Sequence, residues 1–192
     1  MNYNIILAGV GGQGGLSVSV LIARAALVSG FLVKQSEVHG MSQRGGEVVA
    51  HLRIADYEIQ SPTIPKGAAD LILAFEPLEA LRYLPWLSAS RGVVVSSSTP
   101  IRNFSSYPDT AEILAELKNL PNCRILDAET IAKQAGNPRA ANVCLLGAAS
   151  ELLPLKPDSL KKEIEAYLST KGEAVIQANL NAFDEGRKKY GS

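Results

Sequence analysis

The sequence predicts an α/β protein with three layers, α/β/α, in which a mixed, mostly parallel sheet lies between helices. Short apolar runs that end in glycine or polar residues alternate with longer stretches rich in alanine and leucine. That order is typical of strands connected by helices. The opening strand, turn, helix and second strand form a βαβ unit, which favours a right-handed crossover. No repeat, linker or low-complexity tract interrupts the chain, so residues 1–192 are expected to form a single domain.

The first 61 residues contain this opening unit and then a change of pattern. Residues 3–8 and 32–36 are short apolar runs that predict strands, and residues 16–29 between them predict a helix. Residues 46–54 alternate apolar and polar side chains and predict a further strand. Residues 56–61 are expected to fold back on that strand as a hairpin.

The middle of the chain continues the alternation of strands and helices. Strands are predicted at residues 70–75, 92–96 and 123–126. Helices are predicted at residues 76–87, 110–120, 128–135 and 138–153.

Two C-terminal helices are predicted after these elements, each with one apolar face. The face of the first contains Leu160, Ile164, Tyr167 and Leu168, and that of the second contains Val175, Ala178, Ala182 and Phe183. The small residues of the second face predict close packing on another helix or on a partner.

Composition excludes several classes of function. Apolar residues make up 46% of the 192-residue chain, which predicts a globular fold. The 19 lysines and arginines balance the 19 aspartates and glutamates, which gives no reason to expect nucleic-acid binding. No apolar run approaches the length of a membrane span, and the first residues contain no signal pattern, so a cytoplasmic location is expected. Two cysteines, Cys123 and Cys144, are too few for a four-iron cluster, and no metal site is predicted.

The stretch GVGGQG, residues 9–14, gives the chain a Rossmann-like start. It contains a G-x-G-x-x-G between a strand and a helix, and Glu37 follows Gly14 by 23 residues, near the spacing of a dinucleotide site. The second helix of a mononucleotide-binding half is missing, however, because a polar loop and a strand follow instead. Three interpretations remain open: a tight turn without a ligand, a dinucleotide site, or contact with a partner subunit or its cofactor. The candidate cofactor-binding residues are Gly9, Gly11, Gly12, Gln13 and Gly14.

A second polar motif, EVHGMSQRGGEVVAHLRI, occupies residues 37–54. It contains both histidines of the chain and a Gln-Arg pair between glycines. His39 can titrate near neutral pH, and Arg44 can bind a carboxylate or phosphate through two hydrogen bonds. His39, Gln43 and Arg44 are therefore predicted as accessory catalytic residues that face a partner's active site, and His51, on the strand, is interpreted as structural.

These motifs together resemble the gamma domain of the 2-oxoacid:ferredoxin oxidoreductases. The similarity includes GxGGQG, HGMSQRGGEVVAHLRI and AADLILAFEPLEALRYL, and later ANVCLLGAA and NLNAFDEGRK. Within this family, the HGMSQRGG segment is most similar to the small (beta) subunit of the indolepyruvate-type enzymes. The resemblance covers almost the whole chain, and residues 101–122 match nothing specific.

The resemblance implies oxidative decarboxylation of a 2-oxoacid with coenzyme A, which yields an acyl-CoA, carbon dioxide and reduced ferredoxin. It also implies that thiamine diphosphate, Mg²⁺ and [4Fe–4S] clusters belong to a large (alpha) partner subunit. The chain itself contains neither a GDG…N diphosphate motif nor four cysteines, so it is expected to be inactive alone. The alternative is a free-standing nucleotide- or CoA-binding α/β module without redox activity.

Overall fold

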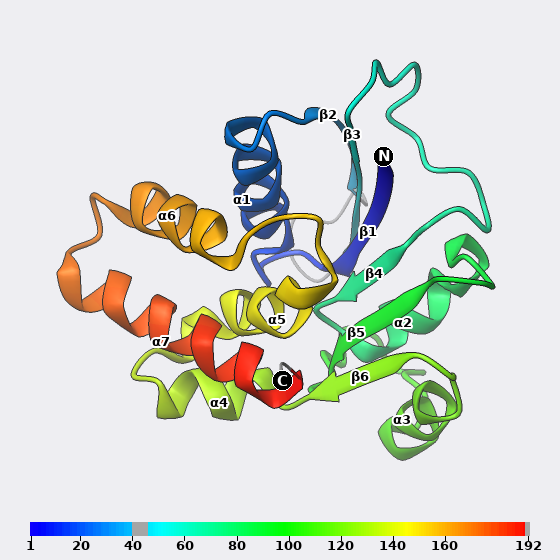
Figure 1. Cartoon of the computed structure of the whole chain (residues 1–192). Helices are drawn as coiled ribbons and strands as arrows, with labels where there is room; N and C mark the ends of the chain where they lie inside the picture. The colour runs from blue at the N-terminus through cyan, green and yellow to red at the C-terminus, as the bar shows by residue number, and fades with distance from the viewer. Residues whose placement is uncertain (40–45, 191–192) are drawn as a thin grey trace.

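The computed structural model describes residues 1–39 and 46–190, which include one six-stranded sheet (Figure 1). The spatial order of its strands is β2 (Leu32–His39), β3 (Glu47–Ala55), β1 (Asn2–Val10), β4 (Leu71–Ala74), β5 (Val93–Ser97) and β6 (Cys123–Leu126). Only β3 runs antiparallel to its neighbours; the other adjacent pairs are parallel. The prediction of a mixed, mostly parallel sheet is therefore confirmed.

Helices cover both faces of the sheet and complete the three layers (Figure 1). On one face lie α1 (Gly15–Val28), α4 (Ala128–Gln134) and α5 (Ala141–Ala149), and α6 (Pro157–Leu168) and α7 (Glu173–Tyr190) pack on the outside of these helices. The other face packs on α2 (Pro77–Arg82) and α3 (Thr110–Lys118). A short 3₁₀ turn, η1 (Leu84–Trp86), follows α2, and two more, η2 (Pro138–Ala140) and η3 (Ser150–Leu152), connect α4 to α5 and α5 to α6. None of the described helices combines the length and apolarity of a membrane span.

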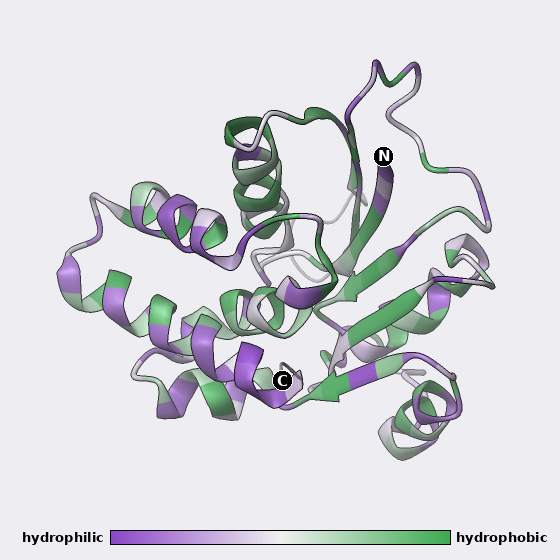
Figure 2. Cartoon of the chain, in the orientation of Figure 1, coloured by the Kyte–Doolittle hydropathy of each residue, from purple (hydrophilic) through white to green (hydrophobic). Residues whose placement is uncertain are grey.

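The central strands are apolar on both sides because both sides are covered. All four residues of β4 are buried, and Figure 2 shows β4 and β5 as almost continuously hydrophobic. The terminal helices instead have alternating apolar and polar stripes in the same view, as expected for helices with one face in solvent (Figure 2).

The hairpin predicted for residues 56–61 is wrong. Those residues form bends and irregular structure, and β3 instead pairs with β1 on one side and β2 on the other. Since both hydrogen-bonding edges of β3 are occupied, no edge remains for a further strand. The segment after β3 folds along the strand instead: Arg53 Nη1 donates to the carbonyl of Ser61 at 2.8 Å, and the backbone N–H of Ile64 donates to His51 Nδ1 at 3.1 Å. His51 is buried, in agreement with the structural interpretation.

Helices α5 and α7 approach each other so closely that their backbones are in contact, as the small residues of the last helix predicted. A Cβ atom added to Gly147 of α5 would lie 2.0 Å from the carbonyl oxygen of Phe183. A Cβ atom added to Gly186 of α7 would lie 2.0 Å from the carbonyl oxygen of Cys144. Both distances are far below van der Waals contact, so this packing requires glycine at each position.

Candidate functional site

A cavity of about 530 Å³ lies at the carboxyl end of the parallel strands. Its lining includes Gly11 and Gly12 of the glycine loop, Phe75 after β4, Ser97 at the end of β5 and Asn142 at the start of α5. In open α/β sheets this edge is where ligands bind, because strand ends and helix N-termini meet there. We call this cavity the crevice.

Gln13 connects the glycine loop to the neighbouring strand. Its side-chain oxygen accepts a hydrogen bond from the N–H of Val10 at 2.9 Å, and its Nε2 donates to the carbonyl of Phe75 at 2.7 Å. One amide thus joins the end of β1 to the end of β4. Gln13 lines the crevice, but its amide groups are already engaged within the chain.

Two of the candidate glycines are explained by packing inside the chain. A Cβ atom at Gly9 would lie 2.8 Å from Gln13 Oε1, so any other residue there would displace the Gln13 amide from its hydrogen bonds. Gly14 has a left-handed backbone with φ of 76°, and a Cβ there would lie 2.5 Å from Asn142 Nδ2. Asn142 Nδ2 also donates to the carbonyl of Gly14 at 3.2 Å. Neither Gly9 nor Gly14 lines the crevice.

Gly11 and Gly12 are the two glycines that line the crevice. Gly12 has φ of 101°, and a Cβ added to it would meet no atom within 4 Å. The N–H of Gly11 donates to the carbonyl of Gly46 at 2.8 Å. Gly46 is the first described residue after the second motif's loop, so this bond joins the two motifs.

The predicted accessory residues are placed only in part. His39 is the last residue of β2; its backbone pairs with Val48, and Val48 pairs with Gly9 on the other side of β3. His39 therefore lies at the same edge of the sheet as the glycine loop, roughly 10 Å from Gly9 across two strand spacings. The expectation that both motifs occupy one side of the sheet is confirmed for their described parts. Gln43 and Arg44 lie outside the described residues.

A buried carboxylate, Glu76, holds the wall next to the crevice. One of its oxygens accepts from the N–H of Glu79 at 3.0 Å and caps α2. The other accepts from the N–H of Ile101 at 3.3 Å and from the hydroxyl of Tyr107. Burial, together with the hydrogen bond to Glu76, raises the pKa of Tyr107 above its usual range, so its hydroxyl remains a donor at neutral pH. Since Ile101 lines the crevice, Glu76 fixes part of its wall.

A second group of charged and polar side chains lies on the α2 side, at the start of β3. The hydroxyl of Tyr83 donates to Glu47, and Arg82 Nε donates to Glu79 at 3.0 Å. Burial raises the pKa of the Glu79 carboxyl, and the Arg82 guanidinium opposes that shift. Glu47 pairs with Val10, the last residue of β1, so this group supports the strand end that precedes the glycine loop.

Sequence reasoning missed the parts played by Asn142 and Glu76. Each had a local signal: Glu76 immediately precedes a helix that begins with proline, a common cap position, and Asn142 lies in the first turn of a helix. Their partners, however, are up to 128 residues away in the chain, and no local pattern indicates them.

The cysteines do not fit a metal or redox site. Burial raises the pKa of Cys123 to about 11 and that of Cys144 to about 12, so both thiols are protonated and poor ligands at neutral pH. Among the described residues no cluster of His, Cys, Asp and Glu has metal-site geometry. A four-iron cluster needs four thiolates, twice the number in the whole chain.

Comparison with known proteins gives consistent matches over the full length. The model of the family described as Pyruvate ferredoxin/flavodoxin oxidoreductase matches residues 4–189. The chain is 39% identical over 196 residues to the indolepyruvate oxidoreductase subunit IorB of Pyrococcus horikoshii, an alignment that covers 97% of this chain and 95% of that protein.

Two solved structures share the fold. The gamma subunit of a keto/oxoacid ferredoxin oxidoreductase from Geobacter sulfurreducens superposes with a TM-score of 0.70 at 25% identity, covering 98% of each chain. The 2-oxoglutarate:ferredoxin oxidoreductase of Magnetococcus marinus, solved with 2-oxoglutarate, coenzyme A and succinyl-CoA bound, superposes with a TM-score of 0.77 at 25% identity. That alignment covers 98% of this chain but 31% of the other, so the shared fold is one part of a larger polypeptide there.

Proposed function

The chain belongs to the pyruvate ferredoxin/flavodoxin oxidoreductase family, and we propose that it is the small subunit of a thiamine diphosphate-dependent indolepyruvate:ferredoxin oxidoreductase. Its homologues are subunits of 2-oxoacid:ferredoxin oxidoreductases. The proposed reaction converts an aryl 2-oxoacid, coenzyme A and two oxidised ferredoxins to an acyl-CoA, carbon dioxide, a proton and two reduced ferredoxins.

The observation that supports this role most directly is the hydrogen bond from Gly11 to Gly46. It joins the ends of the two motifs at one edge of the sheet, beside a cavity of the size that ligands occupy. Gly12 has an open Cβ direction there, so another molecule can approach the backbone closely. We infer that this edge faces the large subunit and forms one wall of its active site.

Coenzyme A is the small molecule most compatible with this wall. The Magnetococcus marinus relative was solved with coenzyme A and succinyl-CoA bound. In the present chain, Gly11 and Gly12 would form this wall near the start of α1, and Gly12 would present its backbone N–H to the thioester end or to a phosphate, because the Gly11 N–H is bonded to Gly46. His39, Gln43 and Arg44 would bind the same substrates from the second motif, and Arg44 could hold a phosphate or carboxylate through two hydrogen bonds.

The redox cofactors belong to the large subunit in this proposal. Thiamine diphosphate supplies the carbanion chemistry and iron–sulfur clusters accept the electrons. The donor set of this chain does not fit a cluster, since it has two cysteines, both with raised pKa values. The small subunit therefore positions substrates and closes the site, and the electrons pass through the partner.

Reconstitution tests the proposal. The chain is purified alone and co-expressed with the large subunit of its native host, and reduction of ferredoxin is measured with arylpyruvate and coenzyme A. We expect activity only when both subunits, the 2-oxoacid and coenzyme A are present. Activity of the isolated chain, or failure of the two chains to associate, would contradict it. The competing possibility, a free-standing CoA- or nucleotide-binding module, requires tight binding of such a ligand by the isolated chain, which calorimetry measures directly.

A further inference from the structure

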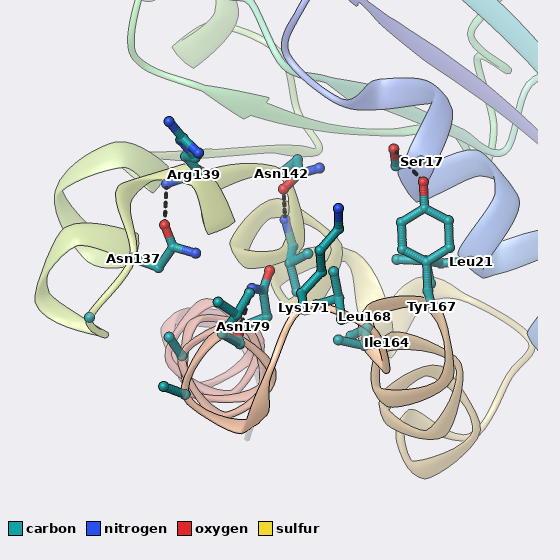
Figure 3. A pocket seen from close by; sticks show the side chains of 15 residues that line it. Ser17, Leu21, Asn137, Arg139, Asn142, Ile164, Tyr167, Leu168, Lys171 and Asn179 are labelled. Atoms are coloured by element: carbon teal, nitrogen blue, oxygen red, sulfur yellow. Dashed lines mark hydrogen bonds between the residues drawn. The ribbon is translucent and has the colours of Figure 1, made fainter.

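A second cavity, of about 630 Å³, lies among the helices on one face of the sheet. It is bounded by α1, α5, α6 and α7 and by the segment that precedes η2 (Figure 3). Arg139 and Asn142 line both this cavity and the crevice, so the two are neighbours, but none of its other lining residues belongs to the glycine loop or to the second polar motif. We call it the helix cavity.

One part of the helix cavity is apolar. Its floor contains the buried side chains of Leu21, Val143 and Ile164. Leu168 of α6 and Val175 of α7 are partly exposed and supply its accessible apolar surface. A surface of this kind, in a cavity of several hundred cubic ångströms, is typical of sites that bind the apolar body of a small molecule. Release of water from this apolar surface on ligand binding lowers the free energy of the system.

The charges at the cavity are all positive. Its fifteen lining residues include Arg139 and Lys171 and no aspartate or glutamate. Within the described part of the chain, neither cation forms an ion pair. Other cations on the surrounding helices do so: Arg24, Lys161 and Arg187 each pair with a carboxylate. Two unpaired cations therefore remain at one cavity of a chain whose formal net charge is zero.

The Lys171 side chain is exposed and lies at the edge of the helix cavity. In Figure 3 it points into the space between Asn142 and the pair formed by Ser17 and Tyr167. The Tyr167 hydroxyl and Ser17 Oγ are 3.1 Å apart and fix each other at the edge of the cavity. The cavity thus has hydrogen-bond donors and a cation at its edge and aliphatic side chains within it.

We propose that the helix cavity binds a small amphipathic carboxylate, whose charged group contacts Lys171 and whose apolar body lies on Leu168 and Val175. An inorganic anion would use the cations but leave the apolar wall in water, and a neutral apolar molecule would leave the cations without a partner. One carboxylate with an apolar body matches both parts. The inference rests on the helix cavity alone and does not depend on the proposed function.

Calorimetry with the full chain tests this site. The probes are phenylacetate and indole-3-acetate as amphipathic carboxylates, their primary amides as neutral isosteres, phenyl phosphate, and inorganic phosphate. We expect the carboxylates to bind with dissociation constants below about 1 mM, a modest affinity for ligands of this size. The amides should bind at least about tenfold more weakly, since they lack the charge.

Variants locate the binding. Lys171→Gln should weaken carboxylate binding about tenfold and leave amide binding unchanged, and it should not disturb folding because Lys171 is exposed. Lys162→Gln, at an exposed lysine of α6 outside the cavity, is the matched control and should bind as the unmodified chain does. Equal binding of acid and amide, no binding in the millimolar range, or unchanged binding by Lys171→Gln would each overturn the proposal. Phenyl phosphate or inorganic phosphate that binds as tightly as the arylacetates would overturn the assignment to a carboxylate with an apolar body.

Discussion

Two substitutions of Gln13 separate a structural role of its amide from a direct role in ligand binding. Gln13→Leu keeps the approximate size of the side chain and removes both hydrogen bonds, to the Val10 N–H and the Phe75 carbonyl. Gln13→Glu keeps an acceptor for Val10 and loses only the donor to Phe75. Glu also places a negative charge beside the first turn of α1, which contains no acidic residue.

The expected losses follow from these bonds. Leaving one partly buried polar group without a partner costs about 1–2 kcal/mol, at the lower end of the range for buried groups. Gln13→Leu leaves two such groups and should lower the free energy of unfolding by about 2–4 kcal/mol. Gln13→Glu leaves one, and the interaction of its charge with the helix dipole recovers about 0.3–1 kcal/mol. Its net loss should be about 1 kcal/mol.

Urea unfolding of the isolated chain, followed by circular dichroism, measures these differences as shifts of the midpoint at constant slope. Gln134→Glu, at an exposed glutamine of α4, is the control and should remain within about 0.5 kcal/mol of the unmodified chain. If the Gln13 amide instead serves a ligand, both Gln13 variants would unfold at the unmodified midpoint and lose activity only in the assembled enzyme. That result would refute the structural role.

Three further predictions concern other parts of the molecule. Gly147→Ala and Gly186→Ala should each destabilise the chain by about 2 kcal/mol in urea unfolding, because the cost of overpacking exceeds the roughly 1 kcal/mol gained in helix propensity. Ala166→Gly, on the exposed face of α6, measures the effect of helix propensity alone. Stabilisation by either alanine would show that the helices separate freely. Burial lowers the pKa of His51, so as the pH falls the unfolded chain binds a proton at this residue before the folded chain does. The contribution of His51 to the free energy of unfolding should be fully present above about pH 6.5 and decrease below it. His51→Asn, which keeps an acceptor for the Ile64 N–H, should flatten that decrease in pH-dependent melts. Arg44→Ala should change the free energy of unfolding of the isolated chain by no more than about 0.5 kcal/mol. It should lower kcat/KM of the complex by a factor equivalent to about 1.5–3 kcal/mol of activation free energy. A much lower melting temperature with normal kinetics would instead make Arg44 structural.

Local patterns predicted the elements of the fold well, because helices and strands report their periodicity in adjacent residues. Strand order depends on distant partners, and the sequence does not contain it in local form. Residues 56–61 illustrate this: their pattern allowed a strand, but β1 and β2 already occupy both edges of β3. The same reason explains why β1 and β2, consecutive in the chain, are not neighbours in the sheet.

In the candidate site, too, local patterns predicted some features and distant partners determined the others. The glycine loop was located correctly at the carboxyl edge of the sheet, but the sequence could not distinguish glycines that face a ligand from glycines that accommodate the chain itself. Gly9 and Gly14 belong to the second kind, because Gln13 and Asn142 occupy the space of their missing side chains. Gly11 and Gly12 line the crevice and retain the proposed ligand role.

The backbone contact between α5 and α7 also has a consequence for how the chain matures on the ribosome. Gly186 follows Gly147 by 39 residues, so at about 5–20 residues per second translation delivers the second helix roughly 2–8 s after the first. Collapse of a chain this size takes less than a millisecond. During that interval the nascent sheet can collapse, but α7 is not yet available to cover the side of α5 that bears Gly147. The hydrophobic core on this face of the sheet also lacks Phe183, which α7 supplies. The packing of α7 on α5 therefore follows the synthesis of α5 by seconds, and ribosome-associated chaperones have that interval in which to bind the exposed α5 surface.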